Sequence, residues 1–509
     1  MPDFTLPSID YLAISPLLIL FGAACVGVLV EALVPRQYRH PIQLGLSLVA
    51  VLVALVMVIR LAGTAVITAG GSVTVDGPAL FMQGALFVFA FVALLLIGER
   101  RVERQGAFVA QAAIPVGSRA DTKQLTALSA TEVYPLTLFS LGGMALFISA
   151  NDLLTMFIAL EVLSLPLYLM CALARRQRLI SQEAAVKYFL LGAYASAFFL
   201  FGVALAYGFA GSVDFADIHA AIGESPYHPG LVFAALALIV MGLLFKAAAA
   251  PFHVWTPDVY QGAPTPIVAF MAAGTKVAAF GALLRVTYVA FEQLAWEWLP
   301  IIGVIAVLTM MLGAILAVTQ TDIKRLLAYS WIANAGYVLV GVLAVGRAGA
   351  SATMFYLVAY GFAVLAAFAV ITLVRDKDGE TPYLARWAGL GRNSPLIAGA
   401  FTLVMLALAG IPLTAGFTAK FAVFSAALAA GEAWLVIAGV LSSLIIAFPY
   451  LRVVVMMWLS EPTESTSTVA KPGILTGSAL AIGVAAIVVL GVAPGPVLDL
   501  AHNAAVFLR

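Results

Sequence analysis

Hydrophobic residues in this chain gather in runs of about twenty, and short polar or Gly/Pro-rich stretches separate the runs. An α-helix needs about 20 apolar residues to cross a bilayer, so the pattern predicts about fourteen transmembrane helices. The predicted fold class is therefore an all-α polytopic membrane protein. We place the helices at residues 14–33, 43–62, 79–98, 134–150, 153–173, 183–210, 230–262, 264–290, 299–318, 323–345, 351–374, 395–427, 433–458 and 473–493.

Two of these predicted helices are broken by helix-disrupting residues. Pro251, Pro257 and Gly262 interrupt the run 230–262, and Gly410, Pro412 and Gly416 interrupt the run 395–427. Non-helical backbone at membrane depth is tolerated only inside protein or beside water. Interrupted helices at corresponding places in two halves indicate an inverted-repeat transporter with its working sites near the midplane.

The two breaks suggest a domain organisation built on an inverted five-helix repeat. Helices four to eight would form the first repeat and helices nine to thirteen the second. The predicted divisions are 1–133 (three helices and a cytoplasmic loop), 134–290 (first repeat), 291–458 (second repeat) and 459–509 (the last helix and tail).

Composition excludes a soluble domain and offers no cofactor site. The chain is 63% hydrophobic and 10% charged, with a mean hydropathy of +1.08. Cys25 and Cys171 are too far apart for an iron–sulfur pattern, and the five histidines are scattered. No Gly-rich fingerprint indicates a nucleotide site. We therefore expect no metal and no cofactor in this chain.

Basic residues of the short loops predict the orientation, because Lys and Arg favour the cytoplasmic side. The loops assigned to that side carry Arg36, Arg39, Arg100, Arg101, Arg104, Arg119, Lys123, Arg175, Arg176, Arg178, Lys324, Arg325, Arg375, Lys377, Arg386 and Arg392. The opposite loops carry mainly acidic residues, namely Asp3, Asp10, Asp76, Asp152, Asp214, Asp217, Glu224, Glu292 and Glu297, with Arg347 as the exception. Both termini should then face away from the cytoplasm. The first helix should stay in the membrane, because no basic segment of a signal peptide precedes it.

Three lysines fall deep in apolar runs, where a charge is costly and is a candidate for function. Lys246 precedes the first break, Lys276 lies about twelve residues into the next helix, and Lys420 follows the second break. An ammonium at the bilayer centre costs roughly 2.5 to 3.5 kcal/mol, so each lysine should be paired, hydrated or neutral. The alternative is that the lysines only snorkel to the headgroups, which is difficult from mid-depth.

Two further charged residues are candidates with open alternatives. Glu161 lies roughly 12 Å below the nearer surface, at 1.5 Å per residue, so it either pairs with a lysine or is a structural carboxylate. Lys187 follows Glu183 by four residues, which also fits an ordinary helix ion pair. His253 and Asp258 could line a cytoplasmic access route or brace the loop.

Several motifs together resemble one family. The motifs are EVLSLPLY, EAAVKYFLLGAYASA, FKAAAAPFHVWTPDVYQGAPTP, TQTDIKRLLAY, NAGY and GIPLTAGFTAKF. They look like the N-type antiporter-like membrane subunit of bacterial NADH:quinone oxidoreductase (complex I, NDH-1), over roughly residues 134–458. The resemblance implies an ion pair of Glu161 and Lys246, a central proton relay at Lys276 and a terminal one at Lys420, with Lys187 also carried over. This chain departs from the family at Trp331 and Asn334, where the family usually has serine and histidine.

The resemblance implies a function as a redox-driven proton translocase subunit that binds no redox cofactor itself. FMN, iron–sulfur clusters and quinone are expected in other subunits of the complex. Expected partners are the M-type subunit, the small K-, J- and A-type subunits and membrane lipids, with no nucleic acid, in the inner (plasma) membrane of a bacterial cell. The alternatives are a stand-alone Mrp-type cation/proton antiporter subunit and a structural spacer whose lysines only hold helices together.

Overall fold

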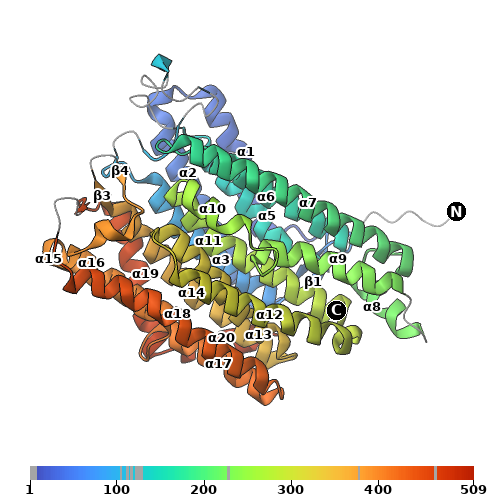
Figure 1. Cartoon of the computed structure of the whole chain (residues 1–509). Coiled ribbons are helices and arrows are strands. Elements are labelled where there is room, and N and C mark those ends of the chain that lie inside the picture. The colour runs from blue at the N-terminus through green and yellow to red at the C-terminus, as the bar shows by residue number, and fades with distance from the viewer. Residues whose placement is uncertain are drawn as a thin grey trace.

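The computed structural model of the chain is a bundle of helices (Figure 1). It describes residues 9–103, 106–109, 114, 118–120, 130–225, 230–376, 379–462 and 467–508. Four charged residues used to predict the orientation, Asp3, Arg104, Lys123 and Lys377, lie outside these ranges. The all-α polytopic prediction is confirmed.

Within the described ranges, 12 helices are long and apolar enough to cross a membrane. They are α1 (Ser15–Leu33), α2 (Arg36–Arg60), α3 (Gly77–Gly98), α6 (Leu153–Cys171), α7 (Arg178–Ala210), α9 (Gly230–Ala247), α11 (Thr265–Arg285), α12 (Ala295–Val318), α13 (Ile323–Leu343), α14 (Arg347–Leu373), α18 (Ala433–Leu459) and α19 (Ile474–Val492). Three shorter apolar helices are α5 (Val133–Ser149), α16 (Pro395–Ala409) and α17 (Ala415–Ala429). The count of about fourteen crossings, estimated at 20 residues each, stays a prediction.

The first predicted break lies between α9 and α10 (Trp255–Gly262). A helix end leaves its last carbonyls without partners, and two tryptophans supply donors here. The indole N–H of Trp255 donates to the Phe245 carbonyl, and that of Trp331 donates to the Ala247 carbonyl, both at 3.1 Å. The interrupted backbone is thus satisfied inside protein.

The second predicted break lies between α16 and α17. Gly410 ends α16 with a φ of 85°, a left-handed conformation that glycine adopts without strain. A Cβ on Gly416 would lie 1.8 Å from the Ala407 carbonyl oxygen, so only glycine lets the two half-helices approach this closely. Whether the two breaks belong to an inverted repeat, and where its domains divide, remains a prediction.

The remaining elements are short, and apart from Val286–Ala290, which lies inside the predicted helix 264–290, they were not predicted from the apolar runs. They include α8 (Phe215–Glu224), α15 (Leu390–Asn393), α20 (Gly495–Ala504), a π-helix η1 (Val286–Ala290) and 3₁₀ turns η2 (Glu292–Leu294) and η3 (Leu384–Trp387). Strands β1 (Val66–Thr68) and β2 (Val73–Val75) pair antiparallel with Val66 opposite Val75. Strands β3 (Val374–Asp376), β4 (Gly379–Glu380) and β5 (Thr468–Val469) form a sheet in the order β4-β3-β5. The strands are too short to show a two-residue period, and α8 and α20 are amphipathic rather than uniformly apolar.

Three helices occupy the middle of the bundle and position the site. The whole apolar span of α11 is buried, and α13 and α14 are almost as completely covered. α7 and α18 run along opposite faces of the molecule (Figure 1) and keep much of their apolar surface exposed. Side chains of α11 and α13 are therefore shielded from the surroundings, whereas those of α7 can reach the outer surface.

Candidate functional site

The three deep lysines of the sequence prediction are all buried. Lys246, in the last turn of α9, is 2% exposed, Lys276 in α11 is 1% exposed, and Lys420 in α17 is 6% exposed. A lysine is almost never this buried unless something stabilises its ammonium. The contacts of each lysine therefore decide what it can do.

Lys246 lies against two tyrosines rather than in contact with a carboxylate. Its Nζ is 5.5 Å from the ring centroid of Tyr168 and 5.4 Å from that of Tyr188. Glu161, on α6, is near enough for its charge to act on Lys246, but the two form no ion pair within 4.0 Å. The Glu161 Oε1 atom is buried and has no hydrogen-bond partner in the described part of the chain. The expected contact pair is thus absent, because the aromatic faces take the place beside the ammonium.

Lys276 is enclosed by indole rings. Its Nζ lies 4.3 Å from the ring centroid of Trp331 and 5.4 Å from that of Trp255. Among the residues that the structure describes, no side chain or carbonyl accepts a hydrogen bond from this ammonium. Within the described part of the chain, cation–π attraction is therefore the only direct contact that stabilises this ammonium, and it is worth about 2 kcal/mol or more in a desolvated site.

Aromatic rings form a continuous connection between Lys246 and Lys276. Tyr188, which contacts Lys246, stacks on Trp255 with centroids 4.5 Å apart and an interplanar angle of 11°. Trp255 then contacts Lys276. The break between α9 and α10 thus brings two lysines from different helices to the two ends of one aromatic stack.

Lys420 has a polar environment. Its Nζ donates to the carbonyl oxygens of Leu408 (3.4 Å) and Ala409 (3.1 Å), at the freed end of α16, and to Ser443 Oγ (2.8 Å). The ring of Tyr337 lies 4.9 Å from the same atom. The second break therefore supplies the carbonyl oxygens that hold the ammonium.

A small cavity joins Lys420 to Asn334. The space open to the centre of a water molecule is about 10 Å³, close to the minimum that one water requires. Its walls include Lys420, Asn334, Tyr356 and Tyr360. The Asn334 amide donates to the Ser330 carbonyl (2.7 Å) and accepts from the Tyr356 hydroxyl (2.5 Å). Hydrogen-bonding groups thus line this cavity although asparagine, unlike the usual family histidine, cannot titrate.

Lys187 lies away from the buried lysines. Its side chain is 42% exposed, and its Nζ contacts Glu183 Oε1 at 2.7 Å and Asp258 Oδ2 at 2.6 Å. Asp258 also accepts from Arg325 Nη1 at 2.7 Å. Sequence reasoning identified the Glu183 pair but missed this bridge across three helices, because α7, α10 and α13 are far apart along the chain. The relay role carried over for Lys187 remains a prediction.

Asp322 is the N-cap residue of α13. Its carboxylate accepts from the backbone N–H groups of Lys324 and Arg325. Burial raises the pKa of the Asp322 carboxyl above its ordinary value, and these amide hydrogen bonds oppose the shift. The cap fixes the start of the helix that carries Trp331 and Asn334.

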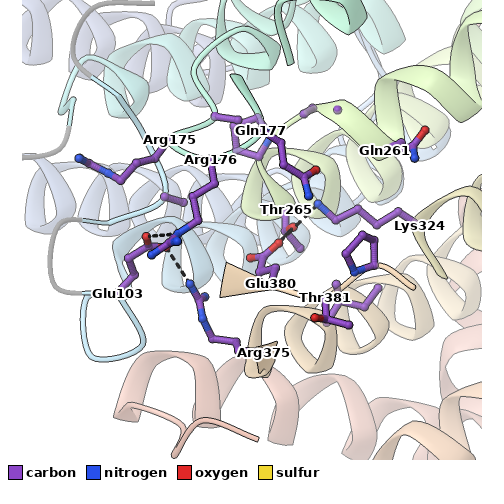
Figure 2. Close-up of a pocket in the computed structure, with 17 residues that line it drawn as sticks. Glu103, Arg175, Arg176, Gln177, Gln261, Thr265, Lys324, Arg375, Glu380 and Thr381 are labelled. Carbon is purple, nitrogen blue, oxygen red and sulfur yellow. Dashed lines mark hydrogen bonds and ion pairs between the residues drawn. The ribbon is translucent and has the colours of Figure 1, made fainter. Parts of the chain in front are cut away.

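Charged side chains surround a pocket of about 70 Å³ at the basic end of the bundle (Figure 2). Glu103 lies between Arg176 and Arg375, at 3.1 and 3.0 Å. Glu380 contacts Lys324 at 3.5 Å and accepts from the hydroxyl of Thr265, the first residue of α11. Glu380 therefore ties the start of α11, which carries Lys276, to Lys324 on α13.

A fully buried ion pair lies at the other end of α11. Arg285 Nη2 contacts Asp76 Oδ1 at 2.7 Å, and both side chains are at most 2% exposed. From the sequence, Asp76 is expected in a surface loop, and Arg285 is not among the predicted site residues. The clue available was an arginine at the end of an apolar run with no acidic residue nearby in the chain.

The chain matches one family of known proteins in both its sequence motifs and its fold. Residues 150–446 match the family described as "NADH:quinone oxidoreductase/Mrp antiporter, TM". The chain is 68% identical to "NADH-quinone oxidoreductase subunit N" of Salinispora arenicola, with 100% of both chains covered. It is 56% identical to the subunit of the same name from Acidothermus cellulolyticus, over 99% of this chain and 97% of the relative. The chain belongs to the subunit N family of NADH-quinone oxidoreductase.

Solved structures agree with membership of the subunit N family. A chain of "Respiratory complex I from Thermus thermophilus with bound Aureothin" has a TM-score of 0.77 and 34% identity, over 96% of this chain and 99% of that one. A chain of the Mrp complex from Dietzia sp. DQ12-45-1b has a TM-score of 0.80 but 22% identity, over 98% and 97%, so it shows a shared fold alone. The resemblance noted in the sequence is confirmed. All five candidate residues, Glu161, Lys187, Lys246, Lys276 and Lys420, fall inside the family match.

Proposed function

We propose that this chain is a proton-translocating membrane-arm subunit of a bacterial NADH:quinone oxidoreductase. The observation that carries the proposal is the set of three buried lysines, two at breaks in the helices and one enclosed by indole rings between them. The subunit N relatives, one of them 68% identical over the full length, favour this function over that of a stand-alone Mrp-type antiporter. A spacer would have no need of three buried ammonium groups, each costly to desolvate.

The proposed route begins on the cytoplasmic side and runs from Lys276 to Lys420. Glu161 and Lys246 form the electrostatic control: when Glu161 moves relative to Lys246, the positive potential felt by Lys276 changes. The aromatic stack from Tyr188 to Trp255 keeps these two lysines apart, so the influence is electrostatic rather than a direct transfer. Lys420 is the terminal carrier.

The chain acts in this proposal as one member of a larger complex. Other membrane-arm subunits, of the M, K, J and A types, lie beside it in the inner membrane together with lipids. FMN, iron–sulfur clusters and quinone belong to other subunits, which supply the redox energy. Both termini face away from the cytoplasm.

Replacement of Lys276 by arginine tests the relay. Guanidinium keeps the positive charge but does not release its proton at physiological pH. We therefore expect Lys276→Arg to assemble normally and to lose proton pumping in inverted vesicles by about tenfold or more, because the relay requires deprotonation. Lys276→Ala should be at least as inactive.

Lys324→Arg is the matched control, since Lys324 is also buried but is paired with Glu380 at the surface end of α13. It should pump as the wild type does. Normal pumping by Lys276→Arg, at equal content of assembled complex, would show that only charge is needed and would overturn the central-relay role. Sodium or potassium transport by the purified chain alone in proteoliposomes would favour the antiporter instead.

A further inference from the structure

Trp331 separates the central lysine from the cavity of the terminal lysine. One contact of its ring is with Lys276 Nζ, at 4.3 Å. Another is with the ring of Tyr360, whose centroid is 4.8 Å away and which forms a wall of the cavity that contains Lys420. Trp331 is 1% exposed, so its indole is buried where it makes these two contacts.

The indole is a barrier to protons as long as it stays there. Its single polar group is a donor, and an aromatic ring offers no lone pair on which a proton could be passed along. The cavity on the Lys420 side of the ring holds about 10 Å³ for water, which is room for about one molecule. Between Lys276 and this cavity there thus lies a ring that cannot carry a proton.

The indole is also hydrogen-bonded to the backbone at the first break, between α9 and α10. Its Nε1–H donates to the carbonyl oxygen of Ala247 at 3.1 Å. Ala247 is the last residue of α9 and follows Lys246 directly. A displacement of the end of α9 would strain or break this hydrogen bond, and thereby reach the ring that covers Lys276.

We propose that Trp331 is a gate between Lys276 and Lys420, held closed by its hydrogen bond to Ala247 and released when the end of α9 moves. The inference rests on the proposed function, because it takes the two lysines to be proton carriers. It assigns a positioning role to a residue at which this chain departs from the serine usual in the family. A movement of the end of α9 beside Lys246 and a displacement of the Trp331 ring toward opening the route to Lys420 are then coupled through one hydrogen bond, that of Trp331 with Ala247.

Two substitutions distinguish the effect of the Trp331 ring from the effect of its hydrogen bond to Ala247. Trp331→Ser removes the ring, so with electron transfer inhibited we expect a several-fold faster passive proton leak in inverted vesicles and fewer protons pumped per electron. Trp331→Phe keeps an aromatic ring but lacks the N–H donor. We expect it to assemble, to oxidise NADH near the wild-type rate and to pump fewer protons per electron, because the gate is no longer tied to α9.

Trp298→Phe is the matched control. Trp298 is 3% exposed and donates to the Phe291 carbonyl at the same 3.1 Å, but it lies on α12 and contacts none of the lysines in the described residues. It should leave leak and pumping unchanged. The double variant Trp331→Ser/Lys276→Arg should lose the leak, because the leak must pass through a lysine that can release its proton.

Three results would contradict the gate. Wild-type leak and pumping in Trp331→Ser, at equal complex content, would show that the ring is no barrier. Wild-type pumping in Trp331→Phe would show that the bond to Ala247 does not control it. A leak that persists in the double variant would show that protons pass through a nonspecific defect and not by way of Lys276. Failure of the lysine route itself is distinguishable, since it would appear as normal pumping in Lys276→Arg alone.

Discussion

Removal of the Asp76 carboxylate should destabilise the chain more than removal of any ordinary helix cap. Asp76 Oδ1 accepts from Arg285 Nη2 at 2.7 Å and from the Ala79 backbone N–H at 3.0 Å, which caps α3. Its Oδ2 accepts from the Leu508 N–H at 3.1 Å. Arg285, which also donates to the Ile148 carbonyl, has a completely buried side chain. One carboxylate therefore joins α3, α11 and the C-terminal segment.

The expected loss in the free energy of unfolding follows from the groups that Asp76→Ala leaves without a partner. Breaking a buried ion pair by removing one partner costs about 3–5 kcal/mol, because the other charge stays buried without compensation. The lost cap costs about 1 kcal/mol. Since the two effects share one side chain and are not strictly additive, we expect a loss of about 4 kcal/mol in the free energy of unfolding. Asp76→Ala with Arg285→Met should recover most of it, because no unpaired charge remains.

The assay is equilibrium unfolding of the full chain in mixed micelles, with increasing SDS and tryptophan fluorescence as the signal. Asp152→Ala is the control. Asp152 caps α6 by accepting from the Thr155 N–H at 2.7 Å, yet it has no ion-pair partner within the described residues. It should lose only about 1 kcal/mol. A loss in Asp76→Ala no larger than in this control, or a double variant no more stable than the single one, would show that Arg285 is not left as a costly unpaired charge.

Two further predictions concern the electrostatic control and the orientation. Glu161→Gln removes the charge but keeps the shape, so turnover and pumping should fall in a complex that still assembles; wild-type activity would leave Glu161 a purely structural role. A cysteine placed near Asp217 should react with a membrane-impermeant reagent in whole cells, and one near Arg176 should not, because basic loops favour the cytoplasmic side. The reverse labelling pattern would invert the direction of the proposed proton route.

Most helices could be predicted from the sequence because a membrane demands long apolar runs. The predicted range 323–345 corresponds to Ile323–Leu343, and 433–458 to Ala433–Leu459. The breaks were also predictable, since proline and glycine act locally on the backbone. In contrast, α8 and α20 are short amphipathic helices that lack such a run.

The site was predictable in its lysines but not in its contacts. Burial of Lys276 follows from its place in an apolar run, which is a local property of the chain. The rings that enclose it, Trp255 and Trp331, come from α10 and α13. No sequence pattern within either helix predicts that these two rings contact Lys276. The same limit explains Glu161 and Lys246: sequence analysis expected a contact pair, whereas packing places two tyrosine rings beside the lysine.

The free carbonyl oxygens at the two breaks have different partners, and this difference bears on the direction in which a proton would move. At the first break tryptophan indoles occupy the carbonyls of Phe245 and Ala247, so the nearby lysines are left to aromatic faces. At the second break the carbonyls bind Lys420 itself, and Ser443 adds a third oxygen. Hydrogen bonds to an ionised group are roughly twice as strong as neutral ones. In the proposed route, a proton that leaves Lys276 thus moves toward oxygen acceptors, and work is required both to open the indole barrier and to release the proton from Lys420.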